Sequence, residues 1–139
     1  MKRSVSLIAV ALLMGIFLGF GADRFLHAQQ EQIKRTTLLQ TELEGVPGKV
    51  ADVFLIEFAP GAATGKHSHP GSEIAYILEG SVAVQAGGNS VPITQRRGSV
   101  IYLTPNEVHD VKNPSQTETT KAIVFGLYDK GKPQTVPAK

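Results

Sequence analysis

The most informative stretch of this chain is GAATGKHSHPGSEIAYILEG, which covers residues 61–80. It contains His67 and His69 at positions i and i+2, and Glu73 follows four residues after His69. Side chains at i and i+2 project from the same face of a β-strand, because strand side chains alternate with period two. A kink at the Pro-Gly pair that follows His69 can return the carboxylate of Glu73 to that face. The spacing therefore predicts nitrogen and oxygen ligands that converge on one point.

A second stretch, GSVIYLTPNEVHDVKN, covers residues 98–113 and contains His109. A histidine from this distant strand would complete a four-ligand set with His67, His69 and Glu73, which predicts a divalent metal ion inside a β-barrel. The chain has no cysteine, so its metal ligands must be nitrogen and oxygen atoms. Isolated His-x-His pairs are also common in surface loops, and the first stretch taken alone leaves a solvated pair open as the alternative.

Together the two stretches resemble the two sequence motifs of the cupin superfamily. Residues 61–80 match the first motif, G-x5-H-x-H-x3-E-x6-G, at every defined position. The second motif, G-x5-P-x-G-x2-H-x3-N, is matched at its first glycine, its histidine and its asparagine. Thr104 stands where the proline is usual, and Asn106 stands where the second glycine is usual. Asparagine is the non-glycine residue that best tolerates a positive φ angle, so we expect the turn at Asn106 to be kept.

The resemblance covers residues 36–130 and implies an all-β fold, the cupin jelly roll or double-stranded β-helix barrel, built as a single unit. The strand pattern agrees with this fold, because frequent short strands without a long amphipathic helix predict a sandwich or small barrel. We expect strands near residues 36–43, 50–58, 73–78, 81–85, 90–94, 99–103, 108–112 and 120–128. Residues 87–89, Gly-Gly-Asn, predict a hairpin, and Pro92 predicts that the expected strand that contains it, residues 90–94, lies at a sheet edge.

The segments that flank this domain have different compositions. Residues 1–28 combine a positive start, an apolar run and a return of charge, which predicts a secretory signal peptide. The apolar run is also close to the minimum length for a membrane span, so an uncleaved membrane anchor is the alternative. Either way, we expect a domain outside the cytoplasm, periplasmic or secreted, or else anchored to the membrane. Residues 29–35 are expected to form a linker, and residues 131–139 a mobile tail.

The charge balance argues against nucleic acid as a partner. The full chain has 14 basic and 12 acidic residues, and removing the leader's three basic and one acidic residues leaves 11 of each. A domain without net charge and without a basic groove lacks the electrostatic features of a nucleic-acid-binding protein. The basic pairs at residues 34–35 and 96–97 are interpreted as solvated surface pairs.

Three imidazoles and one carboxylate suit one divalent transition metal, which the sequence leaves open among Fe, Mn, Zn, Cu and Ni. The resemblance implies a metal-dependent oxidoreductase of the quercetinase-like dioxygenase class that acts on a small organic molecule. Glu73 would then also accept a substrate proton. Cupins also include proteins without catalysis, and a shared fold does not transfer function. The alternatives are a non-catalytic module that binds a small organic acid or sugar, and a purely structural metal site.

The first two predicted strands carry apolar residues at both parities: Leu38, Leu39, Phe54, Leu55 and Ile56. Neighbouring residues on a strand face opposite ways, so these side chains cannot all point into one barrel. The side chains that point away from the barrel interior must contact solvent, another part of the chain or a partner. We therefore predict a homodimer that buries the outer face of the sheet.

Overall fold

The computed structural model describes residues 32–89 and 91–138, and the predicted export segment, residues 1–28, lies outside them. The described chain forms ten strands: β1 (Ile33–Glu42), β2 (Lys49–Phe58), β3 (His67–Ser68), β4 (Ser72–Glu79), β5 (Ser81–Ala86), β6 (Ile93–Arg96), β7 (Val100–Leu103), β8 (His109–Lys112), β9 (Thr120–Asp129) and β10 (Val136–Pro137). None of its segments is a helix of the length and apolarity that crossing a bilayer requires.

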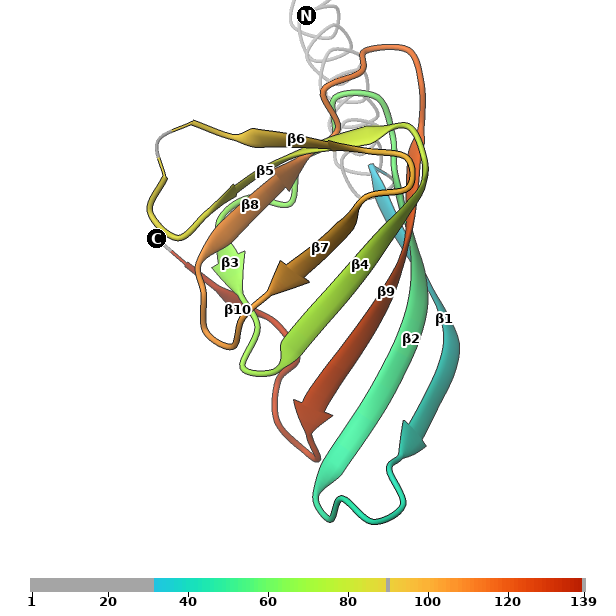
Figure 1. Cartoon of the computed structure of the whole chain (residues 1–139), viewed down its shortest axis with the longest axis vertical. Helices are drawn as coiled ribbons and strands as arrows, with labels where there is room; N and C mark the ends of the chain where they lie inside the picture. Colours follow the sequence, from blue (N-terminus) through green and yellow to red (C-terminus); the bar gives the residue numbers. More distant parts are fainter. Residues whose placement is uncertain (1–31, 90, 139) are drawn as a thin grey trace, which may run out of the picture. The chain divides into compact units, whose positions relative to one another are not determined.

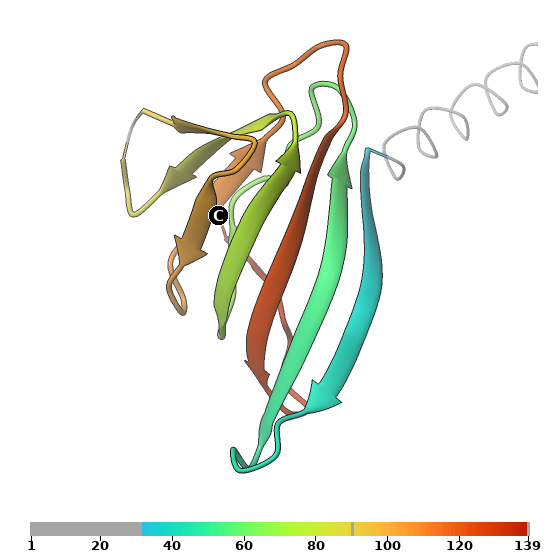
Figure 2. The ribbon, with the colours of Figure 1, turned by 45° about the vertical axis from the view of Figure 1, so that its right-hand side comes forward.

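The strands form two antiparallel five-stranded sheets (Figure 1). One sheet has the order β1-β2-β9-β4-β7, and the other has the order β10-β3-β8-β5-β6. Figure 2 shows the long strands β4, β9, β2 and β1 side by side in the first sheet. The all-β jelly-roll prediction is confirmed. The chain crosses over between the strands of each sheet, so that strands distant in sequence lie side by side. β2 and β9, for example, pair over ten residues.

Side chains on the inner faces of the two sheets form the core. Along β9 the burial alternates strictly over most of the strand, because its even-numbered residues face the interior and its odd-numbered residues face outward. The buried core cluster joins the two sheets and consists of Ile77, Val82, Val84 and Ala122. This packed cluster leaves the rest of the interior available for a site.

Two features of the connecting turns follow the sequence-based expectations. Asn106 has a φ angle of 63° and is the one non-glycine residue with positive φ in the described ranges, as expected for the position where the motif has glycine. The turn at residues 87–88 follows β5, which pairs with β6, and β6 lies at a sheet edge; β6 begins at Ile93, later than the expected strand start at residue 90. The asparagine in place of glycine therefore leaves the turn before His109 intact.

Asn113, the last residue of the second motif, ties together the chain segments at one end of the barrel. Its side chain is fully buried, at 0% exposure. Its Nδ2 donates to the carbonyl oxygens of Phe58, Ala59 and Glu118 at 3.1, 3.1 and 2.8 Å, and its Oδ1 accepts from the Ser115 amide at 3.0 Å. Asn113 is thus a structural residue of the motif.

The boundaries of the domain differ from the sequence-based expectation at both ends. β1 begins at Ile33, inside the expected linker at residues 29–35, and β10 lies inside the expected mobile tail at residues 131–139. β10 pairs with β3, and the Ala138 amide donates to the Lys66 carbonyl at 3.0 Å. The polar, proline-containing sequence of the tail conceals this strand, because its pairing depends on a partner far away in the sequence.

Candidate metal centre

Three histidines come together between the sheets. His67 begins β3, His69 follows that strand directly, and His109 begins β8. β3 and β8 pair in register at His67 and His109, so backbone pairing alone places the two motifs side by side. One candidate ligand atom from each of the three residues lies within 4.8 Å of the other two.

Backbone carbonyls fix the orientation of all three imidazole rings. Nδ1 of His67 lies 2.8 Å from the Gly65 carbonyl, and Nδ1 of His69 lies 2.9 Å from the Gln134 carbonyl. Nδ1 of His109 lies 2.9 Å from the Glu107 carbonyl. A carbonyl oxygen can only accept, so each neutral ring carries its proton on Nδ1 and keeps its lone pair on Nε2. This is the arrangement of histidines that bind metal through Nε2.

Two further observations show that these residues fit a metal ion. Nε2 of His109 is buried and has no hydrogen-bond partner among the described residues. Nε2 of His69 faces Oε2 of Glu73 at 3.3 Å, although both atoms are acceptors when the ring is neutral and the carboxylate ionised. A cation near these atoms would compensate the unpaired lone pairs.

Burial sets the protonation of the two inner histidines. It lowers the pKa of His69 and of His109 below the ordinary value, because the charged imidazolium is disfavoured away from water. For His69 and His109, carbonyl hydrogen bonds oppose this shift without reversing it. Both rings are therefore neutral near pH 7, which is the form that binds a metal ion.

Glu73, the predicted fourth ligand and catalytic residue, lies beside the three histidines. It projects from β4 and is buried, and burial raises the pKa of its carboxyl group. It is not part of the group whose ligand atoms all lie within 4.8 Å of one another. Its direct coordination of the ion stays a prediction, and so does its catalytic role.

Tyr128 holds the carboxylate of Glu73, a role that was not predicted from the sequence. Its hydroxyl donates a hydrogen bond to Oε1 of Glu73, which leaves Oε2 toward His69. Burial and the neighbouring carboxylate raise the pKa of Tyr128 far above its ordinary value, so the hydroxyl keeps its proton. Gly126 makes this contact possible, because a Cβ atom there would lie 2.4 Å from the Tyr128 hydroxyl oxygen. A glycine inside a predicted strand was the available sign of such a close approach.

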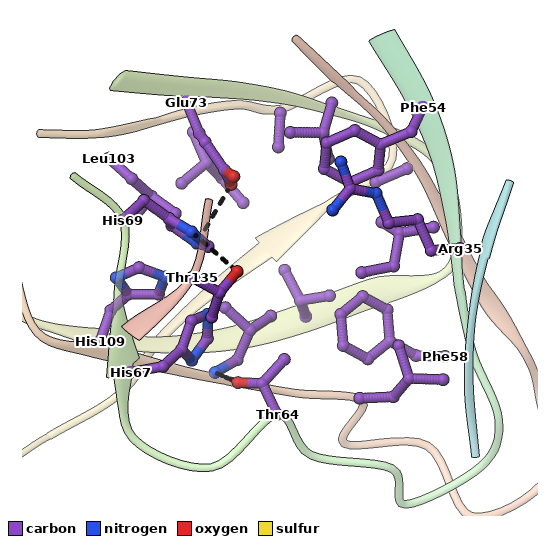
Figure 3. Close-up of a pocket in the computed structure, with 18 of the residues that line it drawn as sticks. Arg35, Phe54, Phe58, Thr64, His67, His69, Glu73, Leu103, His109 and Thr135 are labelled. Atoms are coloured by element: carbon purple, nitrogen blue, oxygen red, sulfur yellow. Dashed lines mark hydrogen bonds and ion pairs between the residues drawn. The ribbon is translucent and has the colours of Figure 1, made fainter. Parts of the chain in front are cut away.

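The histidines lie at one end of a cavity of about 390 Å³ (Figure 3). This volume is in the lower part of the range of small-molecule sites, about 300–1,000 Å³. Its wall is predominantly apolar and is formed by residues of both sheets, among them Phe54, Ile77 and Val124 of the first sheet and Val82 and Val111 of the second. A molecule in this cavity would meet the histidines on one side and apolar side chains on the others.

Arg35 also lines the cavity, which corrects the interpretation of residues 34–35 as a solvated pair. It lies on the inner face of β1, opposite Ile56, whereas Lys34 lies on the outer face. The Arg35 guanidinium is paired with Asp52, which is 1% exposed, through an Nη2–Oδ2 contact of 2.5 Å. The two adjacent basic residues therefore have different environments.

These features define the class of the protein as a jelly-roll barrel with a three-histidine cluster at the wall of an internal cavity. The chain belongs to the cupin family, whose domain model matches residues 54–126, just over half of the sequence. No curated protein sequence matches the chain.

Solved structures support the fold. A cupin superfamily protein from Desulfitobacterium hafniense has a TM-score of 0.58 and 17% identity, with 71% of this chain and 80% of that chain covered. A polyketide cyclase from Streptomyces resistomycificus has a TM-score of 0.63 and 17% identity, with 78% and 72% covered. A DMSP lyase from Ruegeria pomeroyi has a TM-score of 0.62 and 18% identity, with 78% and 53% covered. At these identities the likeness concerns the fold alone.

Proposed function

We propose that this protein is an exported metal-binding cupin and a metal-dependent oxidoreductase of the dioxygenase class that acts on a small organic molecule. The observation that carries the proposal is the convergence of three histidine side chains at the wall of a predominantly apolar cavity. A closed structural site would not need an adjoining space of about 390 Å³. Histidine and carboxylate ligands with positions left open are typical of metal-dependent oxygenases.

In this proposal each residue has a defined task. His67, His69 and His109 would hold one divalent transition metal (Fe, Mn, Zn, Cu or Ni), with Glu73 as the fourth ligand or as the group that accepts a substrate proton. The bound ion would polarise the substrate and, if redox-active, exchange electrons with it. Tyr128 orients the Glu73 carboxylate by its hydrogen bond. A substrate packed against the apolar wall would displace water, which would strengthen the electrostatic interactions inside the cavity.

Oxygen uptake by the purified full chain tests this function. The protein is loaded with Fe, Mn, Cu or Ni in turn and given phenolic compounds and keto acids, with dioxygen as the oxidant. We expect substrate-dependent oxygen uptake with at least one metal and none without metal. The product should contain both atoms of the dioxygen molecule. Binding of a compound to the loaded protein without any uptake would contradict the enzyme and favour the non-catalytic binding module.

Export is the second part of the proposal, and it rests on the composition of residues 1–28. We expect the protein outside the cytoplasm, with a new terminus near Gln29 if the segment is cleaved. Mass spectrometry of the protein, expressed with its own N-terminus and isolated from each cell fraction, tests this. Intact Met1 in the membrane fraction would favour the anchor, and intact Met1 in the soluble cytoplasm would contradict both forms of export.

We further propose that the protein is a homodimer through the outer face of the first sheet. The strand register places two rows of side chains on this face: Leu39, Val53, Phe125, Ile74 and Tyr102 in one row, and Thr36, Leu55, Ile123, Tyr76 and Val100 in the other. Neither row contains a charged residue. The charges beside them are paired within the chain, Lys34 with Glu57 at 3.6 Å and Lys121 with Glu79 at 3.2 Å. A second copy could cover this face without repulsion between like charges.

Light scattering over a concentration series tests the dimer. We expect a mass of twice that of one chain for the wild type. Tyr76, which is 47% exposed in the second row, is replaced by lysine, and we expect this variant to be a monomer because the interface would bury its charge. Ile93→Lys is the matched control, because Ile93 is exposed on β6 of the other sheet. A wild type that stays monomeric at high micromolar concentration would refute the dimer.

A further inference from the structure

The cavity contains a positively charged group that the proposed metal centre does not use. Arg35 projects inward from β1, an edge strand, and lies across the cavity from His67, His69 and His109 (Figure 3). Most of the wall between these two ends is apolar. The cavity therefore has polar groups at two separate ends, which suits a molecule with two polar groups on an apolar body.

Three contacts hold Arg35 in one orientation. Its guanidinium carbon lies 3.7 Å from the centroid of the Phe54 ring, in a cation–π arrangement. Nη2 donates to Asp52 Oδ2 at 2.5 Å and to Gln134 Oε1 at 2.9 Å. Gln134 Nε2 also donates to Asp52 Oδ2, at 3.1 Å, and so closes a triangle of three side chains. The arginine is thus positioned before any ligand arrives.

Most of the guanidinium donors remain free. The contacts to Asp52 and Gln134 use Nη2 only, and Nε and Nη1 of Arg35 have no hydrogen-bond partner among the described residues. The side chain lines the cavity and is 36% exposed, so part of it is accessible to a ligand. A guanidinium presents its donors in a planar fork that matches the two oxygens of a carboxylate.

The charge balance of the cavity also favours an anion. Two cations line it, Arg35 and Lys66, and two carboxylates accompany them, Glu73 in the wall and Asp52 behind Arg35. These four charges cancel, so a bound divalent ion would leave the cavity positive. An acidic ligand would restore neutrality in a region of low dielectric, where the interaction between charges is strong.

We propose that the cavity takes an organic acid with an aromatic or branched apolar body, and that Arg35 binds its carboxylate. This inference rests on the proposed function, because it names the class of molecule that is presented to the histidines. The body would lie among the apolar side chains of the wall. A sugar fits less well, because its hydroxyl groups would lose water without finding partners along most of this wall.

Calorimetry with two matched probes tests the inference on the zinc-loaded full chain. The probes are 3-phenylpropanoate and 3-phenylpropan-1-ol, which share an apolar body and differ in the acidic group. We expect the acid to bind at least about tenfold more tightly than the alcohol, as a charge-assisted hydrogen bond implies. In Arg35→Gln we expect this preference to disappear while the affinity for the alcohol stays within about threefold.

Two further variants keep the test decisive. Lys34→Gln removes the adjacent charge from the outer face of the same strand, and we expect it to keep the full preference for the acid. Arg35→Lys keeps a cation beside the buried Asp52 but loses the planar fork, so it covers the case in which Arg35→Gln fails to fold. We expect this variant to lower the ratio of the affinity for the acid to the affinity for the alcohol several-fold.

The outcomes separate this inference from the proposed function. Equal binding of acid and alcohol to the wild type, or an equal loss of both in Arg35→Gln, would overturn the role of Arg35. Oxygen uptake with neutral phenols alone would overturn the acid class while leaving the oxidoreductase intact. A clear acid preference without oxygen uptake would keep the acid site and reject the enzyme.

Discussion

Replacement of His109 with alanine is expected to abolish stoichiometric binding of the divalent metal ion. His109 is 2% exposed, and its Nε2 has no partner among the described residues, so its lone pair is available to an ion. The substitution removes one of three converging imidazoles and leaves two from the β3 segment. Loss of a residue that only orients a ligand costs about 10–100-fold in metal affinity, and loss of a ligand should cost more.

Metal analysis after dialysis and a zinc titration measure this effect. Lys112→Ala, an exposed substitution on the same strand β8, is the matched control and should keep full occupancy. Circular dichroism checks that the His109→Ala variant retains its strands. Near-full metal occupancy in a folded His109→Ala protein would show that the two sequence motifs do not converge on one ion.

Asn113→Ala is expected to lower the free energy of unfolding by about 3 kcal/mol or more. The asparagine side chain is fully buried and makes hydrogen bonds to three carbonyl groups and one amide. Alanine leaves several of these backbone groups without a partner, and each buried unsatisfied group costs about 1–3 kcal/mol. The melting temperature should fall by roughly 10 °C, given the usual relation for domains of this size.

Urea denaturation measures the change directly. Asn89→Ala in the exposed hairpin between β5 and β6 is the control, and we expect it to change the free energy of unfolding by less than about 0.5 kcal/mol. The folded Asn113→Ala protein should still bind metal, because Asn113 contacts none of the three histidines through its hydrogen bonds. A loss of stability no larger than that of Asn89→Ala would reject the structural role of Asn113.

The long strands and the histidine cluster could be predicted because their signals are local. β2 and β9 are rich in branched and aromatic residues, and β9 also alternates between buried and exposed positions. The spacing within each motif indicated His67, His69 and His109, and the pairing of β3 with β8 brings them together. β3 and β10 have two residues each, which is too short for a compositional signal.

The opposite end of the cavity could not be predicted, because it depends on strand parity and on distant partners. Lys34 and Arg35 look alike in sequence, and only the register of β1 against β2 puts one outside and the other inside. A bulge between Thr37 and Leu39 then changes the parity of the strand, and both Leu38 and Leu39 are exposed, at 56% and 53%. Gln134 is 99 positions from Arg35, and nothing near it in the sequence indicates their contact.

The strand that carries this distant partner has a kinetic consequence. β10 lies at a sheet edge and pairs with β3 through two residues, so it should detach far more often than the long strands. Gln134, just before β10, touches both ends of the cavity, since its carbonyl accepts from His69 and its side chain holds Arg35. Each detachment would therefore loosen the support of His69 and of Arg35 at the same time, and with it the contacts of a bound molecule at both ends of the cavity. We expect the dissociation rate of a ligand to be set by how often β10 detaches, and not by the summed strength of the ligand's individual contacts.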